Sequence, residues 1–466
     1  MAALLTGLQA LLGSDNVVAG AEVSAAVYSP WTRLGEPVAL VRPRSTAEVA
    51  GVVRLAREFS TPVVPWGGRT GLVDGALADG AIALSFERMA AVEAIDPAAS
   101  TLTVQAGCVL ETACRAVEAE GLFLPLDLGA RGSATLGGMI ATNAGGNRVL
   151  RYGMTRDSVL GLEVVLADGT VISSLNTLIK NNAGYDLKQL FIGSEGTLGI
   201  VTRAVLRLRP KPVSQQTALV GVDRFEALAP LLRLLEGELA GGLSAFEAMW
   251  PEFYELVTTP PAAGRPVLPP AFAFYVLVES LGADPELDGD RFNRVLNRAL
   301  EDGLIADAVI AKSQAECDRL WALRDDVAQT ARNGPILTFD VGLPIARMDG
   351  YVADVRATLA RALPKATLTV FGHLGDGNLH LIVGADPAAK AQVEAAVYRP
   401  LASLNGTVSA EHGIGLQKRA YLHLSRSAEE IALMRQLKAA LDPGNLLNPG
   451  KILSGPGSAD VNQAAT

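Results

Sequence analysis

The chain has 466 residues, of which 49% are hydrophobic and 19% charged, and its formal net charge is −9. A chain of this length is expected to fold as two or more domains with buried cores. The acidic balance argues against a nucleic-acid partner, because phosphate binding requires clustered Lys and Arg.

Three cysteines without a CxxC pair indicate buried thiols in a reducing compartment. The first residues carry no basic stretch and are expected to form an amphipathic helix rather than a signal peptide. Apolar runs fall short of the roughly 20 residues that a membrane helix needs, so no transmembrane segment is expected. The predicted location is the cytoplasm, with peripheral docking to a membrane left open.

Short strands and helices alternate in the first half of the chain. Residues 1–35 are expected to be helical. The 3.6-residue period of AEVAGVVRLAREFS at 47–60 predicts a helix, and TPVVPW at 61–66 predicts a strand that runs into two glycines. From 81 to 209 short apolar strands dominate, with glycine dense between them. This pattern is typical of an α+β fold rather than a regular βαβ array.

The proline-marked segment RPKPVS at 209–214 predicts a domain boundary. After it, apolar strands alternate with amphipathic helices, including a helix at 313–331 and a hairpin at 366–384. The pattern predicts an antiparallel sheet with helices on one face. A last helix is expected from Glu429 onward.

Glycine-rich turns in the first half are candidates for anion binding. PWGGRTGL at 65–72 follows a predicted strand, and its glycines allow backbone N–H groups to approach a pyrophosphate. It matches neither a Walker A loop nor a G-x-G-x-x-G fingerprint. Further glycines crowd 128–147 and 184–200. Because each glycine loses more entropy on ordering, contact with a ligand explains this density better than structural turns, which remain the alternative.

Three of the four histidines lie within about forty residues in the second half. His373 and His380 flank Gly-Asp-Gly-Asn, a strong turn, so their rings are expected to face each other across a hairpin. With Glu411 they would form a metal site with an open position, zinc being preferred over Mn²⁺ or Fe²⁺. His412 would point away from Glu411 if both lie in a strand, which leaves it free to act as a general base. The alternative for each histidine is a structural role, the one assigned to His423.

The chain resembles FAD-dependent D-2-hydroxyacid dehydrogenases of the vanillyl-alcohol oxidase superfamily, of the D-2-hydroxyglutarate and D-lactate type. Six motifs carry the resemblance in the same order: PWGGRTGL, LPLDLGARGSATLGGMIATNAGGNRVLRYG, GYDLKQLFIGSEGTLGIVT, GHLGDGNLH, SAEHGIGLQKR and NPGK. It implies a two-subdomain FAD-binding domain at 1–213, a substrate and metal-binding domain at 214–428, and a C-terminal helix and tail at 429–466 that return to the first domain.

The resemblance implies that glycines and their neighbours in these motifs bind FAD. The residues implied are Pro65, Gly67, Gly68, Arg69, Thr70, Gly71, Pro125, Gly138, Thr142, Asn143, Gly145, Gly146, Gly153, Glu195, Gly196, Gly199, Ile200 and Asn448. No histidine precedes His373, and Cys108 and Cys114 are expected to be buried thiols, so FAD is expected to bind non-covalently.

The resemblance also implies the reaction. His373, His380 and Glu411 would hold a divalent metal that binds a 2-hydroxy acid, and His412 would take the hydroxyl proton while hydride passes to the flavin. Arg324 would bind the carboxylate, and Asn378 would add an amide contact.

One position departs from this pattern. Hydroxyglutarate-specific members carry a lysine after the arginine, whereas here Thr338 lies near that place, which favours a smaller substrate such as D-lactate. Arg332 or Arg347 could substitute for that lysine, so D-2-hydroxyglutarate stays open.

Two other functions stay open on the sequence. One is an FAD-linked oxidase subunit of a larger complex such as a glycolate oxidase, and the other is a metal-dependent hydrolase whose glycine-rich half is scaffold. For the dehydrogenase, the expected electron acceptor is an electron-transfer flavoprotein, a quinone or a cytochrome. A homodimer is compatible with the sequence.

Overall fold

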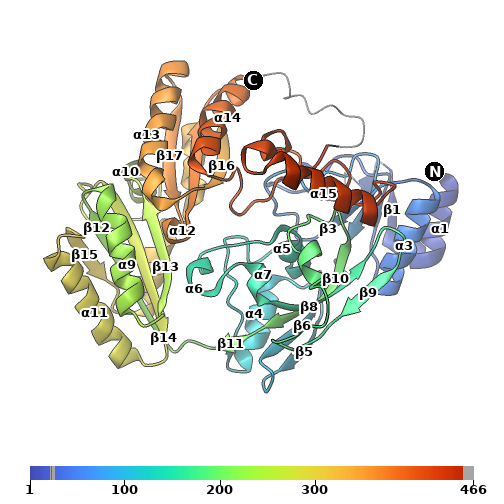
Figure 1. Cartoon of the computed structure of the whole chain (residues 1–466), viewed down its shortest axis with the longest axis horizontal. Coiled ribbons are helices and arrows are strands. Elements are labelled where there is room, and N and C mark those ends of the chain that lie inside the picture. Colours follow the sequence, from blue (N-terminus) through green and yellow to red (C-terminus); the bar gives the residue numbers. More distant parts are fainter. Residues whose placement is uncertain (21, 24–26, 455–466) are drawn as a thin grey trace. The chain divides into compact units, whose positions relative to one another are not determined.

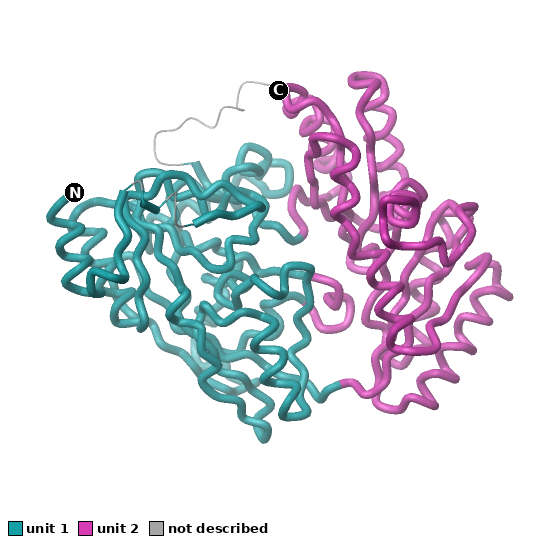
Figure 2. The backbone as a smooth tube through the Cα atoms, turned by 180° about the vertical axis from the view of Figure 1, so that it is seen from behind, with its two compact units in different colours: residues 1–145, 154–211, 411–466 teal, residues 146–153, 212–410 magenta. Residues whose placement is uncertain are grey.

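The structure, a computed structural model, describes residues 1–20, 22–23 and 27–454 (Figure 1). The chain forms two compact units (Figure 2). Unit 1 comprises residues 1–145, 154–211 and 411–466, and unit 2 comprises residues 146–153 and 212–410. Among the described residues, no helix combines the length and the apolar character needed to cross a membrane.

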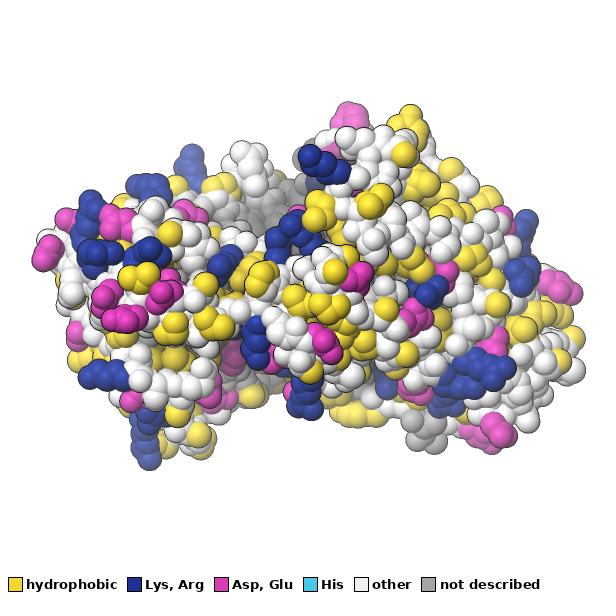
Figure 3. Space-filling view, turned by 90° about the horizontal axis from the view of Figure 1, so that it is seen from below, with side chains coloured by type: hydrophobic (Ala, Val, Ile, Leu, Met, Phe, Trp, Pro, Cys, Tyr) yellow, Lys and Arg dark blue, Asp and Glu magenta, His cyan; other side chains and the backbone are white. Residues whose placement is uncertain are grey.

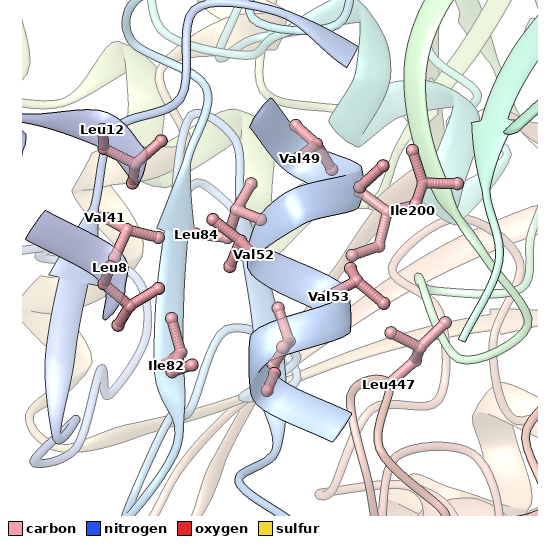
Figure 4. Close-up of a cluster of buried hydrophobic side chains, with 14 of the residues drawn as sticks. Leu8, Leu12, Val41, Val49, Val52, Val53, Ile82, Leu84, Ile200 and Leu447 are labelled. Atoms are coloured by element: carbon pink, nitrogen blue, oxygen red, sulfur yellow. The ribbon is translucent and has the colours of Figure 1, made fainter. Parts of the chain in front are cut away.

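The first sheet of unit 1 has four strands in the order β1-β2-β4-β3. Its strands are β1 Val17–Ala19, β2 Ala39–Val41, β3 Val63–Trp66 and β4 Ile82–Ser85. The helices α1 (Ala2–Leu12) and α3 (Thr46–Glu58) pack on it, and Figure 4 shows Leu8, Val52 and Ile82 in their shared core. The helix predicted over 1–35 is confirmed for α1 but does not continue through the range, because Gly13 takes a φ of +83° and β1 follows. Residues 22–23 are helical again, and residues 21 and 24–26 of the predicted range lie outside the described residues.

The second sheet of unit 1 is antiparallel, with the order β5-β6-β10-β8-β9. Its strands are β5 Val92–Asp96, β6 Thr101–Gln105, β8 Val159–Val165, β9 Val171–Ser174 and β10 Ile200–Arg207, and a separate pair joins β7 Leu122–Phe123 to β11 Arg209–Pro210. The helices of this part are α4 Leu110–Ala119, α5 Leu136–Thr142, α7 Thr155–Ser158 and α8 Lys188–Phe191. The strands predicted between 81 and 209 are confirmed, because their apolar residues do fill a buried core.

The end of the described chain returns to unit 1 through α15 (Ala428–Leu441). Leu447 pairs in parallel with Val63, and the backbone N–H of Asn448 donates to the Val63 carbonyl at 2.8 Å. The NPGK motif is therefore held beside β3, the strand that leads into the first glycine loop.

Unit 2 contains a seven-stranded sheet in the order β15-β12-β14-β13-β17-β18-β16. Its strands, all antiparallel to their neighbours, are β12 Ser214–Val222, β13 Leu243–Met249, β14 Phe274–Gly282, β15 Asp307–Ile310, β16 Ile336–Gly342, β17 Thr367–Gly372 and β18 Asn378–Gly384. Its helices are α6 Val149–Tyr152, α9 Leu228–Glu238, α10 Pro251–Thr258, α11 Pro285–Glu301, α12 Gln314–Asp325, α13 Ile345–Ala362 and α14 Lys390–Tyr398.

Helices cover both faces of this sheet, whereas the sequence predicted one. From α10 and α12, Phe253 and Leu320 pack with Leu219 of β12 on one face. Gln216, of opposite strand parity to Leu219, meets α11 on the other face, where a Cβ built on Gly289 would lie 3.7 Å from its side chain. The reason is that β12, β13 and β14 are buried at nearly every position, so both faces need cover.

Candidate functional site

The glycine loop after β3 opens onto a cavity in unit 1. The cavity has a volume of about 510 Å³ and is lined by residues 67–70, 133 and 135, with Tyr28 and Trp31 at its wall. This volume lies within the range of small-molecule and cofactor sites. Of the residues predicted to bind FAD, Gly67, Gly68, Arg69 and Thr70 line it.

The chain's own packing explains two of these glycines. A Cβ built on Gly67 would lie 2.4 Å from Thr135 Oγ1, and one on Gly68 would lie 2.0 Å from the Ser133 carbonyl oxygen. Around Gly71 nothing lies within 4 Å of such a Cβ. Gly67 and Gly68 therefore allow two glycine-rich segments, 65–72 and 128–147, to meet at the cavity.

Several predicted FAD side chains have partners within unit 1. Arg69, with a φ of +57°, pairs with Glu87 at 3.3 Å. Thr142 Oγ1 donates to the Gly138 carbonyl at 3.1 Å, and Asn143 Oδ1 accepts from the Arg156 amide at 2.9 Å. These side chains therefore contact neighbours in unit 1, Arg69 at the cavity wall and Thr142 and Asn143 away from it.

Glu195 anchors the loop that follows His412. Its carboxylate accepts hydrogen bonds from the backbone N–H groups of Ile414, at 2.7 Å, and Gly415, at 2.9 Å. Burial raises the pKa of Glu195 above its ordinary value, although these amides oppose the shift. Asn448 Nδ2 donates to the Glu195 carbonyl at 2.7 Å, so three motifs distant in sequence meet inside unit 1.

The other residues predicted for FAD do not line the cavity. Gly146 and Gly153 belong to unit 2, whereas those in unit 1 are Pro65, Gly71, Pro125, Gly138, Thr142, Asn143, Gly145, Glu195, Gly196, Gly199, Ile200 and Asn448. Gly196 has a φ of +71°, and a Cβ there would lie 2.8 Å from Pro65 Cγ, so backbone conformation and close packing account for it.

In unit 2, the predicted hairpin brings the two histidines together. His373 follows β17, His380 lies in β18, and their ring centroids are 5.3 Å apart. Both side chains are buried. Gly377 closes the turn between them with a φ of +87°, a conformation that favours glycine. The expectation that the two histidines meet at the hairpin is confirmed, although the rings lie edge to face, with an interplanar angle of 80°, and Phe371 is the residue opposite His380 in the strand register.

Asp340 joins this pair from β16. It lies opposite His380 in the strand register, and an Asp340 carboxylate oxygen lies within 4.8 Å of a His380 ring nitrogen. Asn378 Nδ2 donates to Asp340 Oδ1 at 2.9 Å. The buried Oδ1 atom of Asn378 has no hydrogen-bond partner among the described residues. The sequence interpretation missed Asp340; the available signal was one carboxylate in the apolar strand ILTFDVG.

A buried ion pair supports the other side of the histidine pair. Arg324, predicted to bind a substrate carboxylate, bonds through Nε to Glu247 Oε2 at 2.8 Å. His373 Nδ1 lies 2.8 Å from Glu247 Oε1, and its Nε2 lies 3.4 Å from Arg324 Nη2. Burial acts to raise the pKa of Glu247, but the charges of His373 and Arg324 outweigh it and lower that pKa. Glu247 also escaped the sequence interpretation, although it is the one acid in β13.

Glu411 and His412 lie in a bend, not in a strand. The alternation of side chains along a strand, on which the predicted separation of Glu411 and His412 depended, therefore does not apply here. Glu411 follows Ala410, the last residue of unit 2. Ser409 lies two residues before Glu411, and its Oγ donates to Asp340 Oδ2 at 3.2 Å. This hydrogen bond attaches the segment that leads to Glu411 to β16.

Known families match both halves of the chain. Residues 37–174 match the FAD binding domain, and residues 211–452 match the C-terminal domain of FAD linked oxidases. The chain therefore belongs to the FAD-linked oxidase family and contains an FAD-binding domain.

Two relatives that match most of this chain are D-2-hydroxyglutarate dehydrogenases. D-2-hydroxyglutarate dehydrogenase of Bos taurus mitochondria is 43% identical, with 91% of this chain and 78% of the relative covered. The enzyme of the same name from Xanthomonas citri pv. viticola is 40% identical, with 91% of each covered.

Two solved structures show the fold. They are p-cresol methylhydroxylase, with a TM-score of 0.77, 16% identity and 97% of each chain covered, and 4-ethylphenol oxidase from Gulosibacter chungangensis, with a TM-score of 0.76, 19% identity and 98% and 97% covered. The fold class expected from the sequence, the vanillyl-alcohol oxidase type, is confirmed.

Proposed function

We propose that this chain is an FAD-dependent dehydrogenase that oxidises a D-2-hydroxy acid, such as D-lactate or D-2-hydroxyglutarate, to the 2-oxo acid. The names of its relatives support the reaction class. The observation that carries the proposal is the buried face of the unit 2 sheet, where two imidazoles meet two carboxylates in a chain with an FAD-binding domain.

FAD would be held non-covalently, with part of it in the cavity beside Gly67 and Gly68. The cavity volume and the glycines in its lining fit a phosphate-bearing cofactor. When bound, FAD accepts a hydride from the Cα atom of the substrate. Burial raises the pKa of Cys108 to about 11 and that of Cys114 to about 12, which disfavours the thiolate that covalent attachment would need.

A divalent cation would be bound by His373, His380 and Glu411, with Asp340 as a further oxygen ligand. Two imidazoles with carboxylates suit zinc, with Mn²⁺ and Fe²⁺ as alternatives. The bond from His373 Nδ1 to Glu247 matches the carboxylate support that metal-bound histidines commonly have. Such a cation acts as a Lewis acid that makes a hydroxyl group more acidic.

The remaining roles follow from charge and hydrogen-bonding capacity. His412 would take the hydroxyl proton, since an imidazole titrates near neutral pH. Arg324 would meet the substrate carboxylate with the part of its guanidinium that is not bonded to Glu247. The buried Asn378 Oδ1 atom would accept a hydrogen bond from the substrate.

The strand that carries Asp340 bears on substrate size. Two residues earlier on the same face, Thr338 pairs with Ile382 of β18. Neither side chain is charged, so these two positions supply no cation for a second carboxylate. We therefore expect D-lactate and other acids with neutral side chains to react at least as well as D-2-hydroxyglutarate.

A substrate panel on the purified FAD-loaded protein tests the proposal. Reduction of the flavin under anaerobic conditions is measured with D- and L-lactate, D-2-hydroxyglutarate and glycolate, with and without chelator. Preferential reduction by a D-2-hydroxy acid supports the function. Protein that binds FAD yet stays oxidised with every acid contradicts it, and hydrolytic activity without FAD would favour a metal-dependent hydrolase.

A further inference from the structure

Residues 146–153 leave the FAD-binding unit and pack within unit 2. We call this segment the arm; it contains α6 and begins and ends at glycines with positive φ, +150° at Gly146 and +77° at Gly153. Both glycines were expected to contact FAD. The backbone conformation is a second reason for a glycine at each position, because a positive φ disfavours residues with a side chain.

The root of the arm is closed inside unit 1. The Ala144 carbonyl accepts hydrogen bonds from the Thr155 backbone N–H at 3.0 Å and from the Thr155 hydroxyl at 2.8 Å. The segment that contains Ala144, residues 142–145, belongs to the motif that is expected to bind FAD. A change in that segment therefore acts directly on the root of the arm.

The tip of the arm is fixed by Glu279, a fully buried carboxylate in β14. Arg148 pairs with it, and Gln215 Nε2, Trp321 Nε1 and Ser244 Oγ donate to it at 2.7, 2.8 and 2.8 Å. A buried carboxylate with this many donors holds its partners in one arrangement, because a lost bond leaves a buried charge under-solvated.

Arg151 adds a second attachment between the arm and the sheet. Its Nη1 donates to the Leu281 carbonyl at 2.5 Å and to the Gly242 carbonyl at 3.3 Å. These acceptors lie at the end of β14 and just before β13. The two arginines thus fix the arm on both sides of Leu150.

Leu150 reaches the turn between the two histidines. A Cβ built on Gly375 would lie 3.0 Å from Leu150 Cδ2 and 3.1 Å from Phe246 Cβ, so the side chain packs directly on the backbone of that turn. Gly375 lies between His373 and Asn378, whose backbone N–H closes the turn on the His373 carbonyl at 3.1 Å. The arm is therefore one wall of the turn that orients both residues.

We propose that the arm couples FAD binding to the order of the 373–378 turn, with Arg148 and Leu150 as positioning residues. FAD that orders Thr142–Gly145 would hold the root of the arm still, and the clamped tip would then restrict the turn. Because coupling is reciprocal, a ligand at the turn would tighten FAD binding by the same factor. This inference rests on the proposed function only for the identity of the ligand at the turn.

Hydrogen exchange of the full-length protein, FAD-free and FAD-loaded, tests the coupling without turnover. In the wild type, FAD should slow exchange of the amides of residues 373–378 by about tenfold, within the 5–150-fold range typical of coupled sites. In Leu150→Ala the FAD effect on these amides should fall below about twofold while FAD remains bound. Leu300→Ala, a truncation of a partly exposed leucine on α11, is the matched control and should keep the full effect.

A second variant guards against misfolding. Arg148→Lys keeps the charge beside Glu279 but loses the guanidinium, so it should fold and show an intermediate FAD effect. Equal FAD-dependent protection of the turn in wild type and Leu150→Ala would overturn the proposal, as would wild-type protein that binds FAD without any change at 373–378. Because this readout needs no substrate, failure of the hydroxy-acid assay leaves it intact.

Discussion

Replacing Arg324 with methionine should destabilise unit 2 strongly. The Arg324 and Glu247 side chains are 4% and 2% exposed, and their N–O distance is 2.8 Å. The variant keeps most of the side-chain volume but leaves the Glu247 carboxylate buried with His373 as its other partner. Loss of one partner of a buried ion pair costs about 3–5 kcal/mol, because the remaining charge is desolvated and uncompensated.

Chemical denaturation of the FAD-loaded protein measures this cost. Arg356→Met is the matched control: Arg356 pairs with Glu252 at 2.7 Å, but its side chain is 49% exposed, so its loss should cost less than about 1 kcal/mol. Adding Glu247→Gln to Arg324→Met should recover part of the lost stability, because the buried charge is removed as well. An Arg324→Met protein as stable as the control variant would refute this account of the ion pair, whatever its activity.

Three further outcomes are expected. Gly68→Ala should lower both FAD occupancy and stability, because its Cβ would lie 2.0 Å from the Ser133 carbonyl oxygen. Gly71→Ala should leave the stability of the FAD-free protein unchanged, because nothing lies within 4 Å of a Cβ there. Equal stability of the two variants would contradict this packing argument. Burial lowers the pKa of Lys451 to about 8 from its ordinary 10.5, so the buried charged form lowers the free energy of unfolding below pH 8. As the pH rises from 8 toward 10.5, the free energy of unfolding of the wild type should increase by up to about 3 kcal/mol relative to Lys451→Met. A difference between the two proteins that does not change with pH would count against this. Chelation should lower flavin reduction by hydroxy acids, with recovery on adding Zn²⁺, and chelated enzyme with full activity would remove the metal from the proposal.

Local patterns in the sequence were enough to predict the hairpin of β17 and β18. Gly375 to Asn378 specify a tight turn, and the turn places His373 and His380 side by side. Asp340 and Glu247 were missed because they come from β16 and β13, strands distant in sequence whose pairing is not encoded locally. A single acid in an otherwise uncharged strand was a signal that could have pointed to both.

The glycine-rich motifs show a second limit of sequence interpretation. Their density indicated a ligand site, and residues 67–70 do line a cavity. The need for Gly67 and Gly68 comes instead from contact with Thr135 and Ser133, which only the folded chain reveals. Similarly, Arg148 lies in a motif expected beside FAD, yet it belongs to unit 2 and pairs with Glu279 in the sheet of that unit.

Surface charge agrees with a small-molecule substrate. On the described part of the face drawn in Figure 3, basic and acidic side chains are interspersed. The side chains proposed to act in unit 2 are instead buried: Arg324, His373, Asn378 and His380 are each at most 8% exposed. The proposed site therefore suits a small-molecule substrate.

Anaerobic mixing of FAD-loaded protein with the two enantiomers of lactate tests the central claim most directly. The account predicts that the D-enantiomer bleaches the visible band of the oxidised flavin, with pyruvate formed in equal amount, and that the L-enantiomer leaves the band unchanged. A flavin that stays oxidised with D-lactate, and with D-2-hydroxyglutarate in the same experiment, would contradict it.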